Sequence, residues 1–353
     1  MSNSDRPPHL VADIGGTNAR FALVDQGTRT PHSEASLPSG DHADLAEAID
    51  AYLQSLPGDM RPRSACIAIA APTYRDEVVF ANLHWEFSID EARRRLGLDR
   101  LVMMNDFAAL AMAVPGIPEG HKAQIGGGAA VPGQPIAVVG PGTGLGVAGL
   151  VWLHDHWTPL PGEGGHVNFA PSDDEEVDIF LIVRGSRDRV SAERLLSGNG
   201  LQRLYRSYCK LDRLSEDGWR AGVEAAIEEG HPALEGRPED ALHPAKISER
   251  ALQRRCDRCI RALERFCGML GTFSGDVALT FGARGGLYLG GGILPRLGTF
   301  FQNSAFRTRF EAKGRMHDYV GGIPTFLITA PIPALTGAAA WLDVVIQMEG
   351  AAS

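Results

Sequence analysis

The sequence has few cysteines and no long apolar stretch. Its 353 residues include five cysteines, an odd number that argues against a disulfide framework. No uninterrupted apolar run approaches the ~18 residues that a membrane span requires. The first ten residues also lack the apolar segment of a secretory signal. We therefore expect a cytoplasmic protein with no membrane partner.

Basic segments are missing as well. Lys and Arg together number 34, against 43 Asp and Glu, which gives a net charge of −9 at pH 7. The chain shows no basic run and no interleaving of basic with aromatic residues. Because proteins that bind nucleic acid concentrate positive charge on one surface, we expect no nucleic-acid partner. At this length the chain is expected to form two domains of ordinary size.

Two of the cysteines are spaced as in half of a zinc site. Cys256 and Cys259 form a C-x-x-C, but no second such pair and no nearby His pair completes a ligand set. The same cysteines fall on a helical stripe of spacing three and four, made of Leu252, Cys256, Cys259, Leu263, Phe266, Cys267 and Leu270. Packing in the core is the preferred interpretation, and metal or redox use is the alternative.

The two commonest phosphate-binding motifs are absent, but two other glycine turns are present. Neither a Walker loop nor the Rossmann G-x-G-x-x-G occurs. From Leu10 to Asp25 the order is apolar strand, turn of Gly15, Gly16, Thr17 and Asn18, and apolar strand. The same order returns around Gly140-Pro-Gly-Thr-Gly-Leu-Gly146. Two such turns suggest a duplicated unit, and a pair of ordinary hairpins is the alternative.

These turns have the chemistry of an anion site. Glycine has no Cβ, so a ligand can approach the backbone, and its N–H groups can converge on an anion. Thr17 and Thr143 add hydroxyl groups to the two turns. Asp13 ends the first strand, where a carboxylate can hold a hydrated metal ion. Since neither turn contains a lysine, a divalent metal must supply the positive charge.

A candidate base follows another expected strand, residues 101–104. Asn105 and Asp106 stand at the carboxyl end of this strand, where ligands collect in open α/β sheets. The Asp106 carboxylate can accept a proton from an attacking hydroxyl. Equally, Asp106 can be the N-cap of the helix expected over residues 107–114, because Asp is favoured there.

Three further polar residues and one glycine run are candidates for ligand binding. Glu163 and His166 lie three residues apart in a glycine-rich loop, as a metal pair or as ligands of a polyhydroxyl compound. The second interpretation is preferred because no third metal ligand is near. Glu193 is a further sugar ligand or a carboxylate in a helix first turn. Gly290–Gly292 lets a nucleoside approach the backbone or forms a tight strand-to-helix turn.

The rest of the pattern alternates between strands and helices, which indicates an α/β class with two lobes. We expect a polar loop over residues 32–40, a glycine-rich loop over 160–169 and a hinge within 115–133. The longest helix is expected at 247–273. Residues 211–245 are polar with weak periodicity and are interpreted as a surface insertion.

Six motifs occur in the order of a known family. They are DIGGTNAR at Asp13, MNDF at Met104, GPGTGLG, LPGEGGHVNF, VSAERLLSG and YLGGGILPR. Together they resemble the bacterial glucokinase family of group-A type, in the hexokinase–actin superfamily. The resemblance runs from Leu10 to about Trp341. The cysteine-rich zinc motif of the related repressor/open-reading-frame/kinase sugar kinases is absent, which favours group A.

The resemblance implies a fold and a set of site residues. The fold is a two-lobed α/β structure of the hexokinase/actin, ribonuclease H-like type, with a duplicated core and a cleft between the lobes. The small domain would comprise residues 1–116 plus 333–353, and the large domain 117–332. The implied glucose ligands are Asn105, Asp106, Glu163, His166 and Glu193, with Asp106 as general base. The implied nucleotide contacts are Ala12, Asp13, Ile14, Gly15, Gly16, Thr17, Asn18, Gly142, Thr143, Gly144, Gly290, Gly291 and Gly292.

The implied activity is ATP-dependent phosphorylation of glucose to glucose 6-phosphate, the first step of glycolysis. ATP and Mg²⁺ are the implied cofactors, with Asp13 holding the metal through water, and the implied assembly is a homodimer. Two alternatives are open. One is a kinase for another hexose such as fructose or mannose. The other is a sugar-sensing regulator without catalysis, although the segment before Leu10 is too short for the helix-turn-helix such a protein would carry.

Overall fold

The computed structural model describes residues 7–58, 61–71, 73, 75–80 and 83–352. The chain divides into two compact units. Unit 1 comprises residues 1–122, 148–161 and 330–353, and unit 2 comprises 123–147 and 162–329. The chain first passes from unit 1 to unit 2 inside the glycine- and proline-rich stretch 115–133. None of the described helices is both long and apolar enough to span a bilayer.

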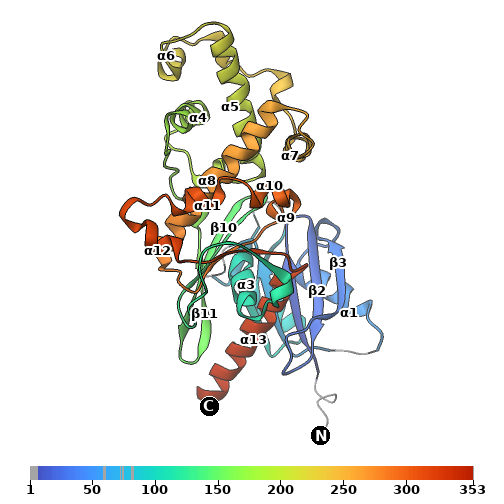
Figure 1. Ribbon diagram of the computed structural model, residues 1–353. Coiled ribbons are helices and arrows are strands. Elements are labelled where there is room, and N and C mark those ends of the chain that lie inside the picture. Colours follow the sequence, from blue (N-terminus) through green and yellow to red (C-terminus); the bar gives the residue numbers. More distant parts are fainter. Residues whose placement is uncertain (1–6, 59–60, 72, 74, 81–82, 353) are drawn as a thin grey trace. The chain divides into compact units, whose positions relative to one another are not determined.

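Unit 1 is built on a five-stranded sheet with the order β3-β2-β1-β4-β7. Its strands and helices are drawn in Figure 1 and have these bounds: β1 His9–Ile14, β2 Asn18–Val24, β3 His32–Pro38, α1 Leu45–Gln54, β4 Ser64–Ile69, β5 Glu77–Val79, β6 Glu86–Ser88, α2 Ile89–Arg95, β7 Arg100–Asn105, α3 Asp106–Ala113 and α13 Pro333–Ala352. β1 pairs with β2 in antiparallel and with β4 in parallel orientation. β4 pairs in parallel with β7, so β1, β4 and β7 end at one edge of the sheet.

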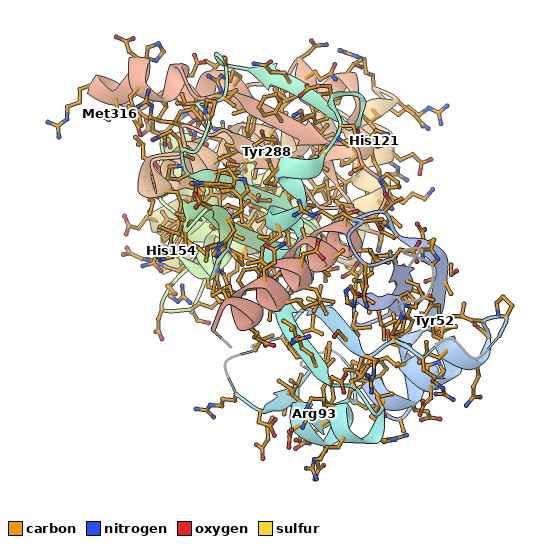
Figure 2. The ribbon with its side chains drawn as sticks, turned by 90° about the horizontal axis from the view of Figure 1, so that it is seen from below. Tyr52, Arg93, His121, His154, Tyr288 and Met316 are labelled. Atoms are coloured by element: carbon orange, nitrogen blue, oxygen red, sulfur yellow. The ribbon has the colours of Figure 1, made fainter. Side chains whose placement is uncertain are left out.

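Two helices of unit 1, α3 and α13, lie side by side (Figure 1). Gly337 of α13 makes this close approach possible, because a methyl group there would come within 1.7 Å of the Ala109 carbonyl oxygen. α1 contacts the sheet elsewhere: Tyr52, labelled in Figure 2, stacks on Phe21 with 5.2 Å between ring centroids. Its hydroxyl donates to the Ser33 carbonyl oxygen of β3 at 2.8 Å. Helix α13 therefore packs against α3, the helix that begins with Asp106.

The second sheet has the order β11-β10-β9-β12-β13-β8, and β9, β12 and β13 are parallel. The elements from residue 122 to 329 are β8 Lys122–Gly126, β9 Ile136–Pro141, β10 Leu145–Leu153, β11 His156–Gly162, α4 Asp174–Arg184, α5 Gly198–Glu216, α6 Val223–Glu228, α7 Pro244–Leu252, α8 Asp257–Phe281, β12 Leu287–Leu289, α9 Leu294–Leu297, α10 Thr299–Gln302, α11 Phe306–Glu311, α12 His317–Gly321 and β13 Thr325–Ile328. In both sheets a hairpin carries a glycine–threonine turn and is followed by two parallel strands. This repetition confirms the predicted duplicated core.

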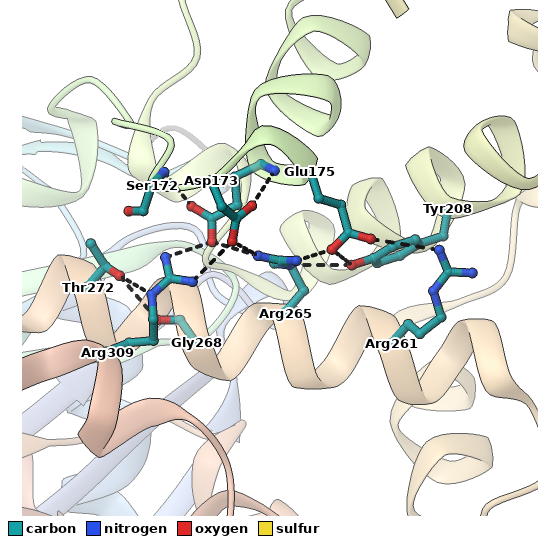
Figure 3. Close-up of polar contacts among 10 residues, drawn as sticks. Ser172, Asp173, Glu175, Tyr208, Arg261, Arg265, Gly268, Thr272 and Arg309 are labelled. Carbon is teal, nitrogen blue, oxygen red and sulfur yellow. Dashed lines mark hydrogen bonds and ion pairs between the residues drawn. The ribbon is translucent and has the colours of Figure 1, made fainter. Parts of the chain in front are cut away.

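An ionic cluster joins the start of α4 to α8 and α11 (Figure 3). Glu176 is fully buried and accepts from Arg265 at 3.1 Å and from Arg309 at 2.7 Å. Arg265 also donates to Asp173 at 2.6 Å and to Glu175. Burial alone would raise the pKa of Asp173, but the backbone N–H of Glu176 and the Arg265 guanidinium outweigh it and hold that pKa below its usual value. The buried carboxylate is thus matched by two guanidinium groups.

Four secondary-structure expectations need correction. The polar loop over 32–40 is mostly strand β3, because exposed polar residues alternate along an edge strand and leave no apolar period. The predicted loop 160–169 includes the end of β11 and a 3₁₀ turn, Gly164–His166. The insertion 211–245 contains the end of α5, all of α6 and the start of α7. A small satellite core of Leu214, Val223, Ala226 and Ala233 orders this segment.

The fourth correction concerns the longest helix. Residues 247–273 are not one helix, since α7 ends at Leu252 and α8 begins at Asp257. Arg254 between them has a φ of 53°, which breaks the helical path. Cys256 is the N-cap of α8, and its Sγ accepts from the Cys259 N–H at 3.4 Å. Cys259 is buried in the core, as predicted, whereas Leu252 is 40% exposed.

Candidate active site

The first glycine turn joins β1 to β2 and presents an exposed tip. Gly16, Thr17 and Asn18 are exposed, while the side chains of Ala12 and Ile14 are fully buried and face away from solvent. Any contact that Ala12 or Ile14 makes with a nucleotide would therefore come from the backbone. Gly15 N–H already donates to the Asn18 carbonyl oxygen at 2.9 Å. The donors left for an anion are the exposed groups of the tip.

Ser39 forms two hydrogen bonds to the backbone of this turn. Its N–H donates to the Thr17 carbonyl oxygen at 3.0 Å, and its hydroxyl donates to the Gly15 carbonyl oxygen at 2.8 Å. Ser39 itself is fully buried. Sequence reasoning missed this residue, because nothing local distinguishes it from any other serine in a polar stretch. The turn is consequently fixed before a ligand arrives, which reduces the entropy cost of binding.

Asp13 is the acidic residue at this turn. Its carboxylate is 21% exposed and pairs with Arg20 across the β1–β2 hairpin, at 3.1 Å. Burial raises the pKa of Asp13, and the Arg20 guanidinium opposes this effect. Asp13 is therefore held in a partly buried site with one cationic partner. Arg20 donates to one carboxylate oxygen, Oδ2, so the other oxygen of Asp13 has room for a hydrated divalent cation.

Asn105 and Asp106 stand where β7 becomes α3. The structure assigns the helix N-cap to Asn105, whose Oδ1 accepts from Phe107 N–H at 2.9 Å and from Ala108 N–H at 3.1 Å. The interpretation of Asp106 as the N-cap is therefore wrong. Asp106 begins the helix, and its Oδ1 accepts from Phe107 N–H at 2.9 Å. Capping occupies the oxygen of Asn105 and leaves its amide NH₂ group for a hydroxyl ligand.

Asp13 and Asp106 belong to the same edge of the sheet in unit 1. Asp13 is in register with Ala68 of β4, and Ala68 with Met104 of β7, two residues before Asp106. Two strand spacings separate β1 from β7, or about 10 Å. Asp13 at the end of β1 and Asp106 at the start of α3 therefore stand at one edge of this sheet, with β4 between their strands. The carboxyl-end placement predicted from the sequence is confirmed.

In unit 2, Glu193 contacts the second glycine turn directly. Its Oε2 accepts from Leu145 N–H at 3.0 Å. Gly144 permits this approach, because a methyl group there would lie 2.5 Å from the same oxygen. Glu193 is in the 3₁₀ turn Ala192–Arg194, not in a regular helix. A predicted sugar ligand and a predicted phosphate turn are thus in hydrogen-bond contact, although they are far apart in sequence.

A cavity of about 470 Å³ in unit 2 collects several of the predicted residues. Thr143, His166 and Glu193 line it, together with Arg187, Asp188, Arg189, Ser191, Arg194, Ser197, Asn199 and Arg203. Glu163 is not among the lining residues; its side chain is 72% exposed and its Oε2 lies 3.9 Å from His166 Nε2. No group of three His, Cys, Asp or Glu suitable for a metal occurs in the described part of the chain. Hydroxyl recognition by Glu163 and His166 therefore stays a prediction.

The glycine run Gly290–Gly292 follows β12 and lies against the second turn. Gly290 N–H donates to the Val139 carbonyl oxygen at 2.9 Å. Gly291 has a φ of 80°, and a methyl group there would come within 2.4 Å of the Pro141 carbonyl oxygen. A tight turn is therefore present. Gly292 has open space around its Cα, so the same turn leaves a path by which a ligand can reach the backbone.

The sequence motifs did not reveal the arginines of this cavity. Arg187 and Arg189 lie in the loop after α4, Arg194 in the 3₁₀ turn Ala192–Arg194, and Arg203 in α5. The only signal in the sequence is the density of arginine between residues 184 and 206, within a chain whose net charge is −9. Periodicity does not predict that these side chains surround one cavity, because the loop between α4 and α5 decides it.

Solved structures with a similar fold identify the class. A glucokinase from an Antarctic psychrotroph superposes with a TM-score of 0.80 at 36% identity, over 96% of this chain and 99% of that one. A glucokinase of the repressor/open-reading-frame/kinase family from Streptomyces griseus, solved with glucose and AMPPNP, gives 0.60 at 20% identity, over 95% and 98% of the two chains. The fold and the site together define a sugar kinase of the actin-like ATPase type.

Sequence comparison then gives the family. The family model described as glucokinase matches residues 10–345. A glucokinase of Aromatoleum aromaticum is 46% identical over 340 residues, which is 96% of each chain. A glucokinase of Chromobacterium violaceum is 45% identical over 335 residues, covering 95% of this chain and 89% of the relative. This chain belongs to the glucokinase family.

Proposed function

We propose that this chain transfers the γ-phosphoryl group of ATP to the 6-hydroxyl of glucose, giving glucose 6-phosphate and ADP as the first step of glycolysis. The observation that carries the proposal is the contact of Glu193 with the second glycine turn, since Oε2 accepts from Leu145 N–H at 3.0 Å. A carboxylate that can bind sugar hydroxyls is held there beside a loop that can bind phosphates. The relatives from Aromatoleum and Chromobacterium, both named glucokinase, support the same activity.

The proposed glucose ligands are those that the family resemblance implies. Asn105 caps α3 through Oδ1, so its side-chain NH₂ group can donate to a sugar hydroxyl. Asp106 contributes its carboxylate. Glu163, His166 and Glu193 of unit 2 complete the set. Carboxylates accept from two neighbouring hydroxyls, whereas the amide and imidazole can donate, so the set provides both directions of hydrogen bonding. Glu193 is half-buried and fixed, and the exposed Glu163 can adjust to the sugar.

Asp106 is the proposed general base. The backbone bond from Phe107 N–H to its Oδ1 orients the carboxylate at the start of α3. In the step, the sugar O6 forms a bond to the γ-phosphorus while the bond from that phosphorus to the β–γ bridging oxygen breaks. The O6 proton passes to Asp106. Since an ordinary Asp carboxyl has a pKa of about 3.9, it is a weak base for an alcohol, and proton transfer follows most of the phosphorus–oxygen bond change.

The nucleotide is proposed to bind three glycine segments. The exposed tip Gly16–Asn18 and the turn Gly142–Gly144 would take the phosphates, with hydroxyl donors from Thr17 and Thr143. Gly290–Gly292 would lie against the adenosine. No arginine or lysine belongs to these turns. Backbone N–H groups therefore do the binding, and the remaining negative charge must be neutralised by a cation.

Asp13 fits the role of an outer ligand for Mg²⁺. Its side chain is 21% exposed, and Arg20 donates to one of its oxygens, Oδ2, at 3.1 Å. Mg²⁺ commonly takes one or two protein carboxylates and completes its shell with water and substrate phosphates. When bound, the ion would neutralise charge on the β- and γ-phosphate oxygens. The residues of the chain then have only to position the sugar and move its proton.

Two further proposals concern cellular context. The five cysteines are all free thiols, as expected in a reducing compartment, and this supports a cytoplasmic location. The family resemblance supports a homodimer. Light scattering coupled to size exclusion at micromolar protein tests the second point, with a mass near 76 kDa expected for a pair of the 37.8 kDa chains.

Steady-state kinetics across sugars and phosphoryl donors test the proposed activity. Glucose, mannose and fructose are each compared with ATP, ADP or polyphosphate as donor, with and without Mg²⁺. We expect the highest kcat/KM with glucose and ATP, and loss of turnover when EDTA removes the metal. A higher kcat/KM for mannose or fructose would identify another hexose kinase. Glucose binding without any turnover would identify a sensor.

A further inference from the structure

A second cavity of about 470 Å³ adjoins the first in unit 2 and contains none of the proposed substrate ligands. Its cationic lining comes from Arg187, Arg203, Arg206, Lys210 and Arg237, and Arg187 and Arg203 also line the first cavity. Three of these residues, Arg203, Arg206 and Lys210, share one stripe of α5, because positions i, i+3 and i+7 project from the same side of a helix. We propose that this cavity is a second site, distinct from the substrate site, which binds a small phosphate-bearing metabolite.

Direct ion pairs do not neutralise the cations of this cavity. Among the described residues, no carboxylate forms an ion pair with Arg187, Arg203, Arg206 or Lys210, although Glu193 attracts Arg203 and Asp240 attracts Lys210 from a greater distance. Single hydrogen bonds to main-chain oxygens hold three of these guanidinium groups. Arg187 donates to Val183 at 3.2 Å, Arg203 to Arg194 at 3.1 Å and Arg206 to Asp240 at 3.3 Å. Each guanidinium keeps further N–H donors for an anion.

The one carboxylate that lines the cavity is already committed. Asp240 accepts from both terminal nitrogens of Arg213, at 2.9 and 3.0 Å, and from the Arg237 backbone N–H at 3.2 Å. Burial alone would raise the pKa of Asp240, but the hydrogen bonds from Arg213 outweigh it and hold that pKa below the usual value. Asp240 thus neutralises Arg213, which is not a lining residue, and leaves the lining cations in excess.

Crowding of like charge is visible in two of these groups. Burial, together with the neighbouring guanidinium groups of Arg194, Arg187 and Arg206, outweighs the attraction of Glu193 and lowers the pKa of Arg203. Burial, Arg213 and Arg206 likewise outweigh the attraction of Asp240 and lower the pKa of Lys210. A dianion in the cavity would reduce this repulsion. In a chain of net charge −9, such a cluster is not explained by general composition.

The lining also indicates the kind of anion. Several cations around one cavity match a phosphate group, which carries up to two negative charges and accepts bidentate bonds from guanidinium. Ile182, Val183 and Pro238 give the same cavity an apolar side. A phosphate ester, with a carbon skeleton to cover that side, therefore fits better than inorganic phosphate alone. Because Arg187 and Arg203 line both cavities, an occupant here changes the charge felt at Thr143, His166 and Glu193.

Calorimetric titration tests the proposal with two probes, inorganic phosphate and glycerol 3-phosphate. Titrations are run in 150 mM NaCl with saturating glucose and Mg-ADP, which occupy the proposed substrate site. The double variant Arg206→Gln/Lys210→Gln changes residues that line only the second cavity. The matched control is Arg220→Gln, an exposed arginine of the same unit that lines neither cavity. Thermal unfolding without phosphate checks that each variant is folded.

We expect the wild-type protein and Arg220→Gln to bind glycerol 3-phosphate more tightly than inorganic phosphate, and the double variant to lose about tenfold or more in affinity for both, since charge-assisted bonds are removed. Without phosphate the double variant should unfold at the wild-type temperature or above, because it relieves repulsion. Absence of binding to the wild type would overturn the proposal, as would equal affinity of the double variant and the control. Both readouts are independent of turnover, so they hold whether or not the chain phosphorylates glucose.

Discussion

At the scale of residues, two hydrogen bonds at the start of α3 define the role of Asp106. The cap formed by Asn105 fixes the start of α3, and the bond from Phe107 N–H orients the Asp106 carboxylate. The sequence alone could not separate a capping role from a catalytic one, because Asp serves both. The structure separates them, since the neighbour performs the capping. The Asp106 carboxylate is therefore not needed as the N-cap of α3.

We predict that Asp106→Asn lowers kcat by about 10²- to 10⁴-fold, the usual contribution of a general base. The Asn side chain keeps the shape and still accepts from Phe107, so the fold should be retained. Glucose affinity, measured by intrinsic fluorescence or calorimetry, should weaken only modestly. A kcat close to that of the wild type would show that Asp106 is not the base.

Gly144 is the second position at which one atom matters. A methyl group there would lie 2.5 Å from Glu193 Oε2, whereas one on Gly142 meets nothing within 4 Å. We predict that Gly144→Ala displaces the Glu193 carboxylate and raises the KM for glucose by about tenfold, as expected for a lost charged hydrogen bond. Gly142→Ala is the matched control, and it should affect the KM for ATP instead. Equal effects of the two variants on the glucose KM would contradict the role given to Glu193.

At the scale of elements, α13 supports the helix that carries Asp106. Gly337 lets the two helices touch, and a methyl group there would come within 1.7 Å of the Ala109 carbonyl oxygen. We predict that Gly337→Ala lowers the free energy of unfolding by about 1–3 kcal/mol, the usual cost of overpacking. Gly350→Ala in the same helix meets nothing within 4 Å and should be neutral or stabilising. Chemical denaturation measures both, and similar values for the two variants would contradict the close contact.

The ionic cluster at α4 sets a pH dependence. The depressed pKa of Asp173 means that its carboxylate stabilises the fold above pH ~3.9, the value in an unfolded chain, and that this contribution is lost as the pH falls through the lower folded-state value. We predict that Arg265→Met costs about 3 kcal/mol at pH 7, because it leaves buried Glu176 with less compensation. The difference from wild type should shrink as the pH falls below that window. Lys246→Met, in an exposed pair with Glu249, is the control and should change little.

Sequence patterns predicted the buried elements well and the exposed ones poorly. The two hairpins and the strand over residues 101–104, observed as β7, were found because unbroken apolar runs between turns have few other structures available. Strand β3 was missed because its residues are exposed on an edge, where no apolar period is required. The α7–α8 break was missed because the apolar stripe continues across it, and only the backbone at Arg254 reveals the change of direction.

At the scale of the whole molecule, most of the proposed site residues were predicted from the family resemblance and not from local spacing. Local spacing placed Asn105 and Asp106 at a strand end, but it could not show that Glu193 reaches the turn at Gly144. That contact depends on how the loop between α4 and α5 returns to the sheet. The cations of the second cavity come from the loop after α4, from α5 and from Arg237, and no sequence motif indicates that these segments meet. The predicted domain boundaries and the nucleotide contacts stay predictions.

The central claim is that this chain makes glucose 6-phosphate from glucose and ATP, and phosphorus NMR of the complete reaction tests it most directly. Wild-type protein with glucose, ATP and Mg²⁺ should convert ATP to ADP and yield one glucose 6-phosphate per ADP, with no inorganic phosphate accumulating. Release of inorganic phosphate in place of the sugar phosphate, or no change in ATP while glucose still binds, would contradict it.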